Sequence, residues 1–280
     1  ARKIVLLIAL FNVSFSYSQF CSNLVADAGQ DINICLGDSI QIGGNPTGEW
    51  DNINGTPPVI TYSWSPNINI SDDTLSNPYV SPTVTTTYTV TITSINNNGN
   101  TCTDQSDIEV TVINPQANAV NSGPICAGQS FTLDETGGDA VSWQWSTNGS
   151  ANISNTIDQS PTVTGAIDGE IFTVEITDSD GCMSTASTTI TVYPLPTVSL
   201  GPFSDICSNA STFSLTGGSP SGGTYSGPGV SNNEFDPSTA NIGNNTITYT
   251  YTDGNGCTNS ATQSIVVFPF PSITLAPFSP

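Results

Sequence analysis

Cysteine and carboxylate side chains are the reactive groups that this sequence supplies in quantity. It has 7 cysteines and 23 acidic residues, but only Arg2 and Lys3 are basic and histidine is absent. A nucleophilic triad needs an imidazole, a Schiff base needs a lysine amine, and phosphate binding favours arginine or lysine. None of these can be assembled downstream of Lys3. The chemistry that remains is paired-carboxylate catalysis, binding of a hard cation, and recognition through aromatic, hydroxyl or backbone groups.

The carboxylates are not arranged as a catalytic pair. Acids do not recur at fixed positions between the internal copies described below, and each copy is too small for a glycosidase cleft of the usual size. We therefore predict that the chain is not an enzyme and has no catalytic residue. Nucleic acid is excluded as a partner because a surface this negative repels a polyanion.

The acidic turn at Asp178 and Asp180 offers hard oxygen donors for calcium. Asp-Gly is also what a tight hairpin requires, and the first copy has only asparagines at this place. We therefore predict no metal site and no cofactor, with calcium at Asp178 and Asp180 as the alternative. Two more acidic groups, Asp134-Glu135 with Asp139 and Asp72-Asp73, are equally compatible with calcium and with solvated loops.

Three internal copies position these residues. Ile34-Cys35-Leu36-Gly37-Asp38-Ser39 recurs as Ile125-Cys126-Ala127-Gly128-Gln129-Ser130 and, more loosely, from Ile206 to Ser211. Each copy later has a threonine-rich alternating run, a polar turn that ends in cysteine (Cys102, Cys182 and Cys257), and an alternating segment that runs into proline. We refer to residues 19–114, 115–194 and 195–269 as repeats 1, 2 and 3, and expect each to be one domain. Residues 269–279 match 194–204, which predicts that a fourth copy begins at 270–280.

The period-two alternation of Val, Ile, Tyr, Phe and Thr, punctuated by Gly, Asn, Asp and Pro, is typical of half-buried antiparallel strands. Copies of this length suit a Greek-key β-sandwich of about seven strands. The predicted fold is therefore all-β, with tandem sandwiches in an elongated array. Trp64 and Trp145 are expected in the cores, and Trp143 lies on the same face of its strand as Trp145. Trp50 is expected in a loop, and Tyr225 stands near the equivalent place in repeat 3.

Small domains bury a smaller fraction of their unfolded surface than large domains do, and disulfides can compensate. Six cysteines fall into three pairs within the repeats, so we expect the disulfides Cys35–Cys102, Cys126–Cys182 and Cys207–Cys257. Cys21 is left over, as a free or intermolecular thiol. A lipid-anchored N-terminus is an alternative, but Gln19-Phe20 makes a poor lipobox.

The first 18 residues are typical of a signal peptide, because Arg2 and Lys3 precede an apolar run and Ser16-Tyr17-Ser18 is a small-x-small cleavage site. Export is therefore predicted, and with it an oxidising compartment and contact with an export machinery. No later segment is long or apolar enough to span a bilayer. We expect a secreted or extracellular protein, attached to the cell surface through regions that follow residue 280.

The module resembles the PKD-like or immunoglobulin-like tandem repeats of Bacteroidetes surface proteins. The residues that carry the resemblance are the Ile-Cys-x-Gly-x-Ser openings, the stretch 222–230 that leads to Phe235-Asp236-Pro237, and the turn 253–257. It covers about residues 24–280. Many such proteins are exported by the type IX system, and they include gliding-motility-associated and adhesin-like chains.

The expected function is that of a non-enzymatic exported stalk or adhesin segment, which acts in spacing, display or adhesion toward an unknown surface glycan or protein ligand. The alternative is a set of accessory modules, with carbohydrate binding as one role for them, of a larger secreted hydrolase.

Overall fold

The computed structural model describes residues 24–50, 59–95 and 101–271, and these contain strands and turns but no helix. The predicted all-β class is confirmed. The expected signal peptide at 1–18 lies outside the described residues. The chain divides into two compact units: one comprises residues 1–117, 137–143 and 175–185, and the other comprises the remainder. Because this division passes through repeat 2, the three domain boundaries stay a prediction.

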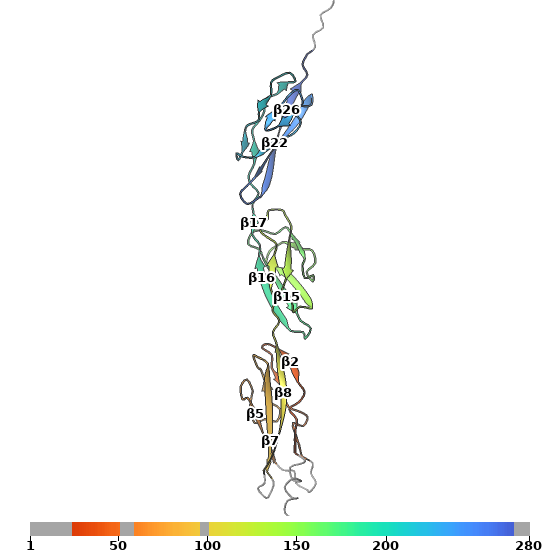
Figure 1. The fold of residues 1–280 in the computed structure, drawn as a ribbon, viewed down its shortest axis with the longest axis vertical. Helices are drawn as coiled ribbons and strands as arrows, with labels where there is room; N and C mark the ends of the chain where they lie inside the picture. Colours follow the sequence, from red (N-terminus) through yellow and green to blue (C-terminus); the bar gives the residue numbers. More distant parts are fainter. Residues whose placement is uncertain (1–23, 51–58, 96–100, 272–280) are drawn as a thin grey trace, which may run out of the picture. The chain divides into compact units, whose positions relative to one another are not determined.

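Repeat 1 folds into a four-stranded sheet with two short strand pairs (Figure 1). The sheet order is β2 (Ile32–Cys35), β8 (Thr101–Ile113), β7 (Thr86–Ile95) and β5 (Val59–Ser65). The opening strand β2 runs parallel to the closing strand β8, whereas β8, β7 and β5 are antiparallel. The short pairs are β1 (Leu24–Ala26) with β4 (Gly48–Trp50) and β3 (Ile40–Gln41) with β6 (Tyr79–Val80).

Repeat 3 has the same plan. One sheet has the order β19 (Ile206–Cys207), β26 (Thr258–Phe268), β25 (Gly243–Thr252) and β22 (Thr224–Ser226). The other strands are β20 (Phe213–Ser214), β24 (Glu234–Phe235) and β23 (Val230–Ser231), with the separate pair β18 (Ser199–Leu200) and β21 (Gly218–Ser219). The chain leaves the first sheet after β22 and returns to it at β25, which is a Greek-key connection.

Repeat 2 divides its closing strand into β16 (Met183–Thr189) and β17 (Val192–Tyr193). The opening strand β10 (Ile125–Cys126) runs parallel to β17, and β16 belongs to a sheet with β15 (Ile171–Thr177) and β12 (Ser142–Thr147). The other sheet has the order β13 (Asn152–Ile153), β14 (Thr162–Thr164), β11 (Phe131–Glu135) and β9 (Ala119–Asn121). All three repeats therefore present an opening strand that is parallel to the end of the closing strand.

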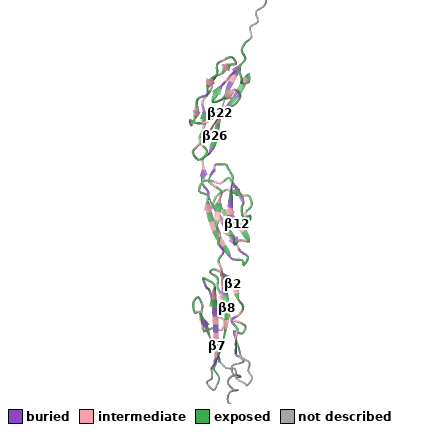
Figure 2. Ribbon diagram, in the orientation of Figure 1, coloured by how far each residue is buried: buried purple, intermediate pink, exposed green. Residues whose placement is uncertain are grey.

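Alternation along the strands builds the cores (Figure 2). In β7, Tyr88, Val90 and Ile92 are fully buried, and the threonines between them are not. In β15, Phe172, Val174 and Ile176 are likewise fully buried. The Phe172 ring packs edge-on against Phe131 of the other sheet. The buried clusters of repeats 1 and 3 likewise take residues from both groups of strands. Apolar burial between two sheets is the main force that holds such a sandwich together.

Candidate functional site

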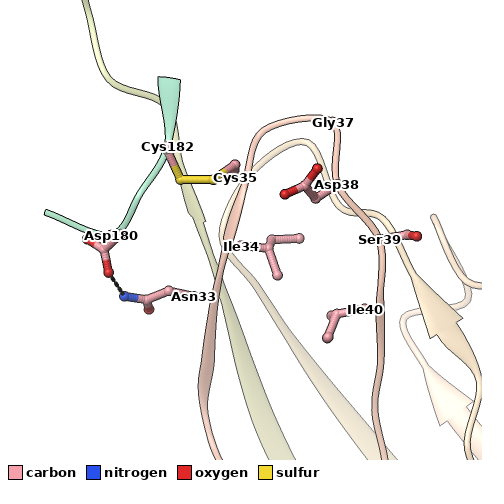
Figure 3. A pocket seen from close by; sticks show the side chains of 9 residues that line it. All are labelled: Asn33, Ile34, Cys35, Gly37, Asp38, Ser39, Ile40, Asp180 and Cys182. Atoms are coloured by element: carbon pink, nitrogen blue, oxygen red, sulfur yellow. Dashed lines mark hydrogen bonds between the residues drawn. A yellow bond between two sulfur atoms is a disulfide. The ribbon is translucent and has the colours of Figure 1, made fainter. Parts of the chain in front are cut away.

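The cysteines form the most regular constellation in the structure. Cys35, the last residue of β2, is bonded to Cys182 in the turn between β15 and β16, with 5.4 Å between the two Cα atoms (Figure 3). Cys126, the last residue of β10, is bonded to Cys257 in the turn between β25 and β26, with a Cα separation of 5.6 Å. Both bonds therefore follow one rule: the opening strand of a repeat is bonded to the hairpin turn of the next repeat. We call these two bonds the joints.

The expected pairing within repeats is wrong, and the sheet register explains why. Cys35 is level with Ile113, the last residue of β8, because β2 and β8 run in parallel. Cys102 lies eleven residues earlier in that strand, which corresponds to about 36 Å. A disulfide needs Cα atoms less than about 7 Å apart.

The same spacing excludes the other two expected pairs. Cys126 is level with Tyr193 and Cys207 is level with Phe268, and the turn cysteine of the same repeat again stands eleven residues before that partner. Each sandwich therefore carries its two cysteines at opposite ends.

The remaining cysteines have three different outcomes. Cys102 is disulfide-bonded, although not to Cys35. Cys207 carries a free, exposed thiol, so its expected bond to Cys257 is absent. Cys21 lies outside the described residues.

An aspartate holds each joint turn in shape. The Asp178 carboxylate oxygen Oδ1 accepts hydrogen bonds from the backbone N–H of Asp180 (2.9 Å) and of Cys182 (2.8 Å). Asp253 Oδ1 does the same for Asn255 and Cys257, at 2.9 Å each. Such local carboxylate-to-backbone bonds fix tight turns. The two turns consequently present the cysteine that follows glycine in the same way.

Glycine is required in both turns, because Gly181 and Gly256 adopt φ values of 87° and 84°. Side chains rarely adopt this left-handed region. The Cys182 and Cys257 side chains are buried, at 2% and 0% exposure, whereas their partners Cys35 and Cys126 are half-buried.

The two calcium candidates thus have hydrogen-bond partners within the protein, Asp178 in its own turn and Asp180 in repeat 1. Asp178 is buried and uses its Oδ1 for the turn, and Asp180 Oδ1 accepts a hydrogen bond from the Asn33 side-chain amide at 2.8 Å. Within residues 24–50, 59–95 and 101–271, no group of three or more histidine, cysteine or acidic side chains is placed to hold a metal ion. The arrangement indicates a structural role for both aspartates.

An open depression of about 540 Å³ lies beside the first joint. Figure 3 shows its lining, which comes from β2, the turn after it, the start of β3 and the hairpin turn of the joint: Asn33, Ile34, Cys35, Gly37, Asp38, Ser39, Ile40, Asp180 and Cys182. Its ionisable groups are the carboxylates of Asp38 and Asp180, and no cationic group or histidine lines it. A surface of this kind offers hydrogen bonds and no nucleophile with an activating base.

The expected core positions of Trp64 and Trp145 are both confirmed. Trp64 and Trp145 are each 1% exposed, and their indole N–H groups donate to backbone carbonyls of Leu75 (3.0 Å) and Asp158 (3.1 Å). Trp143 is half-buried. The expected loop at Trp50 is wrong, because this residue ends strand β4 opposite Leu24. Tyr225, in the equivalent strand β22, stands where the sequence predicts it.

The remaining acidic groups differ from one another. Asp72 lies in a loop, exposed, and its carboxylate accepts from the hydroxyl and the N–H of Thr74; these two bonds lower its pKa. Asp139 is also exposed, and its carboxylate accepts the N–H of Gln116. The loop expected at Asp134 and Glu135 is wrong, since both lie in strand β11, and Glu135 is only 1% exposed.

No protein-family model and no curated protein sequence matches the chain. Solved structures align with it at low identity. They include mouse cadherin-23 EC22-24 (13% identity, 86% of this chain and 96% of that chain, TM-score 0.34) and a Ca2+-stabilized adhesin of an Antarctic bacterium that binds ice (16%, 89% and 73%, 0.41). The insect immune protein hemolin aligns at 15% identity over 88% of this chain and 76% of its own, with a TM-score of 0.27. These TM-scores are too low to indicate a shared function.

Within the described part of the chain, no helix is long and apolar enough to cross a membrane.

Proposed function

We propose that the chain is an exported, non-enzymatic cell-surface segment, a stalk or adhesin segment whose immunoglobulin-like repeats act in spacing, display or adhesion. The observation that carries this proposal is the pair of joints, Cys35–Cys182 and Cys126–Cys257. Each joint adds a second covalent connection between consecutive repeats, next to the chain itself. Two connections restrict bending and twisting more than one, which is the property that a spacer needs.

The charge of the chain supports an extended assembly. All 23 acidic residues follow Lys3, and no cationic side chain follows it. Like charges repel over about 8 Å in physiological salt, so the repeats gain nothing by folding back on one another. The prolines at the ends of the repeats, Pro115, Pro194-Leu195-Pro196 and Pro269-Phe270-Pro271, favour stiff and extended linkers.

The cysteine chemistry supports export. Disulfides persist in oxidising compartments and are rare in the cytosol, and this chain uses them as its regular structural element. The expected signal peptide at 1–18 gives the route, in line with the resemblance to type IX-exported surface repeats. The lack of lysine and arginine after Lys3 also removes every cleavage site for trypsin-like proteases, which is useful outside the cell.

Small-angle X-ray scattering tests the stalk. The oxidised chain of residues 19–280 is compared with the double variant Cys35→Ser/Cys126→Ser, which opens both joints and leaves the sandwiches intact. We expect an extended particle for the parent and a broader distribution of dimensions for the variant, in low and in high salt. Scattering typical of one compact globule, with or without the joints, would contradict the proposal.

Location and ligand need their own measurements. Antibody labelling of intact cells of the source organism is expected to detect the repeats, and a signal only after lysis would contradict surface display. Adhesion through the repeats themselves predicts binding of the 19–269 chain on glycan arrays or to a surface protein. A glycan-selective signal would favour the carbohydrate-binding alternative over a plain spacer.

A further inference from the structure

Cys207 occupies the same place in repeat 3 as the two joint cysteines occupy in repeats 1 and 2. Cys35, Cys126 and Cys207 each end the opening strand, and each is paired in parallel register with the end of the closing strand, opposite Ile113, Tyr193 and Phe268. The first two are bonded to a turn cysteine, whereas Cys207 is free and exposed.

The backbone around Cys207 already has the joint geometry. The N–H of the following residue donates to the closing strand in all three repeats: Leu36 to Ile113 O (2.9 Å), Ala127 to Tyr193 O (2.8 Å) and Ser208 to Phe268 O (2.9 Å). The N–H of the third residue after each cysteine returns to the cysteine carbonyl, at 3.0, 3.0 and 3.1 Å. Repeat 3 therefore holds a bonding-competent cysteine without rearrangement of its backbone.

The outgoing chain is attached at the same place. The N–H of Phe270 donates to the Ser208 hydroxyl at 3.1 Å, so the residues that leave repeat 3 pass directly beside Cys207. From Pro269 onward the sequence repeats the one that leads from repeat 2 into repeat 3. A repeat placed there would bring its hairpin turn to the end of the sandwich that carries Cys207, as repeats 2 and 3 do for Cys35 and Cys126.

We propose that Cys207 forms a third joint with the turn cysteine of a following repeat of this kind. The partner is a cysteine that ends an Asp-x-x-Gly-Cys hairpin turn, as in 178–182 and 253–257, where the aspartate holds the cysteine N–H. A following repeat is the occupant, because in both existing joints the turn cysteine comes from the repeat next along the chain. This inference does not depend on the proposed function.

The bond forms by thiol–disulfide exchange with a small-molecule disulfide or a disulfide oxidoreductase as oxidant. The Cys207 thiol loses its proton, and the thiolate attacks the oxidant disulfide, which releases one thiolate of the oxidant and leaves a mixed disulfide. The thiolate of the turn cysteine then attacks the Cys207 sulfur of this mixed disulfide and expels the second thiolate of the oxidant. The two cysteines lose two protons and two electrons, and the oxidant is reduced to two thiols.

An extended chain tests the third joint. Residues 205–268 are added after Ser279, so that they follow residues 269–279, the counterpart of the segment 194–204 that precedes them in the parent, and the added copy of Cys207 is changed to serine. The protein is oxidised in a glutathione buffer, alkylated, and digested with pepsin, because trypsin has no site after Lys3. We expect alkylation of Cys207 to fall from that of a free thiol to the level of Cys126. Peptide maps should show a Cys207 peptide linked to a Cys257 peptide, beside the Cys126–Cys257 link that the original turn already forms.

The two existing joints are the internal references in the same maps. The matched control, Cys207→Ser in the extended chain, should make the added turn cysteine alkylatable. A second extended chain, residues 1–269 followed by 116–193 with the added Cys126 changed to serine, repeats the test with another turn. Cys207 that stays alkylatable in both chains while the references remain bonded would overturn the proposal. So would a Cys207 linked mainly to a second copy of the chain.

Discussion

Repeats 2 and 3 share the cysteine positions but fill their interiors differently. Repeat 2 uses Trp145, whose indole N–H donates to the Asp158 carbonyl. Repeat 3 instead places Tyr225 and Tyr249 with their ring centroids 4.7 Å apart. Tyr249 is 2% exposed, and its hydroxyl accepts the N–H of Gly223 at 2.8 Å and donates to the Pro220 carbonyl.

The position two residues before the first buried apolar residue of the long hairpin, Phe172 in repeat 2 and Ile247 in repeat 3, differs in the same way. Repeat 2 has Glu170 there and repeat 3 has Asn245, which are 3% and 1% exposed. Both cap the corner that leads into the hairpin: Glu170 accepts the N–H of Ile167, and Asn245 accepts the N–H of Asn241. The anionic Glu170 and the neutral Asn245 thus accept a backbone hydrogen bond at the same place in the two repeats. Interiors and corners vary between repeats 2 and 3, whereas the two joint turns keep one geometry.

The largest expected effect comes from removing the large aromatic side chain from the core strand of each repeat, Trp145 in repeat 2 and Tyr225 in repeat 3. Trp145→Ala should destabilise repeat 2 by about 3–5 kcal/mol, since it removes a fully buried indole and leaves a cavity. Tyr225→Ala, at the equivalent strand of repeat 3, should cost less because that side chain is half-buried. Hydrogen exchange of the full chain, read separately over β15 and β25, measures both. Equal losses of protection would show that Trp145 and Tyr225 contribute equally to the stability of their repeats.

The close backbone approach in repeat 3 gives the next effect. A Cβ atom at Gly223 would lie 2.5 Å from the Tyr249 ring carbon Cζ and closer still to the Thr250 carbonyl oxygen. Gly223→Ala should therefore cost about 1–3 kcal/mol through overpacking. Gly254→Ala is the matched control in the same repeat, because nothing lies within 4 Å of its added Cβ. Exchange rates over β25 should rise in the first variant alone, and a parallel rise in both would contradict the packing argument.

The sequence predicts the strands and the core well, because both depend on local alternation. Trp64 and Trp145 could be assigned to cores from their place in an alternating strand. The cysteine pairing failed because it depends on strand direction, which alternation does not show. The sequence alone sets no limit on the distance between two cysteines of one repeat. In the structure, the parallel register of β2 with β8 places Cys35 and Cys102 about 36 Å apart.

A signal for the correct pairing is nevertheless present in the sequence. Pairing within each repeat uses six cysteines and leaves Cys21, which precedes the first opening strand, as an extra one. If each opening cysteine is paired instead with the turn cysteine of the next repeat, the odd cysteine is Cys207, in the opening strand of repeat 3. For a different reason, the burial of Glu135, which the sequence assigns to a loop, is not predicted. Its burial depends on contacts from outside its own strand, such as the Asn118 N–H at 3.0 Å, and no local pattern records them.

The smallest expected effect is a pH response at the corner that leads into the hairpin, where repeat 2 has the ionisable Glu170 and repeat 3 has the neutral Asn245. Burial raises the pKa of Glu170, but hydrogen bonds from the Thr147 hydroxyl and from the N–H groups of Ala151 and Ile167 outweigh it, and the net pKa is lowered. A carboxyl with a lowered folded pKa stabilises the fold above its unfolded pKa of about 4.3. This stabilisation is lost as the pH falls through the folded value.

Glu170→Gln isolates this contribution, because glutamine keeps the shape but has one acceptor oxygen and no charge. At pH 6 the variant should be less stable than the parent by about 1 kcal/mol, the size of one hydrogen bond. At a pH well below 4 the difference should shrink, since the parent carboxyl is then being protonated. Exchange over β15 in parent and variant at each pH measures it, with Asn245→Asp in repeat 3 as the reciprocal change that should introduce a pH response there. A difference that stays constant between the two pH values would assign the effect to shape and not to charge.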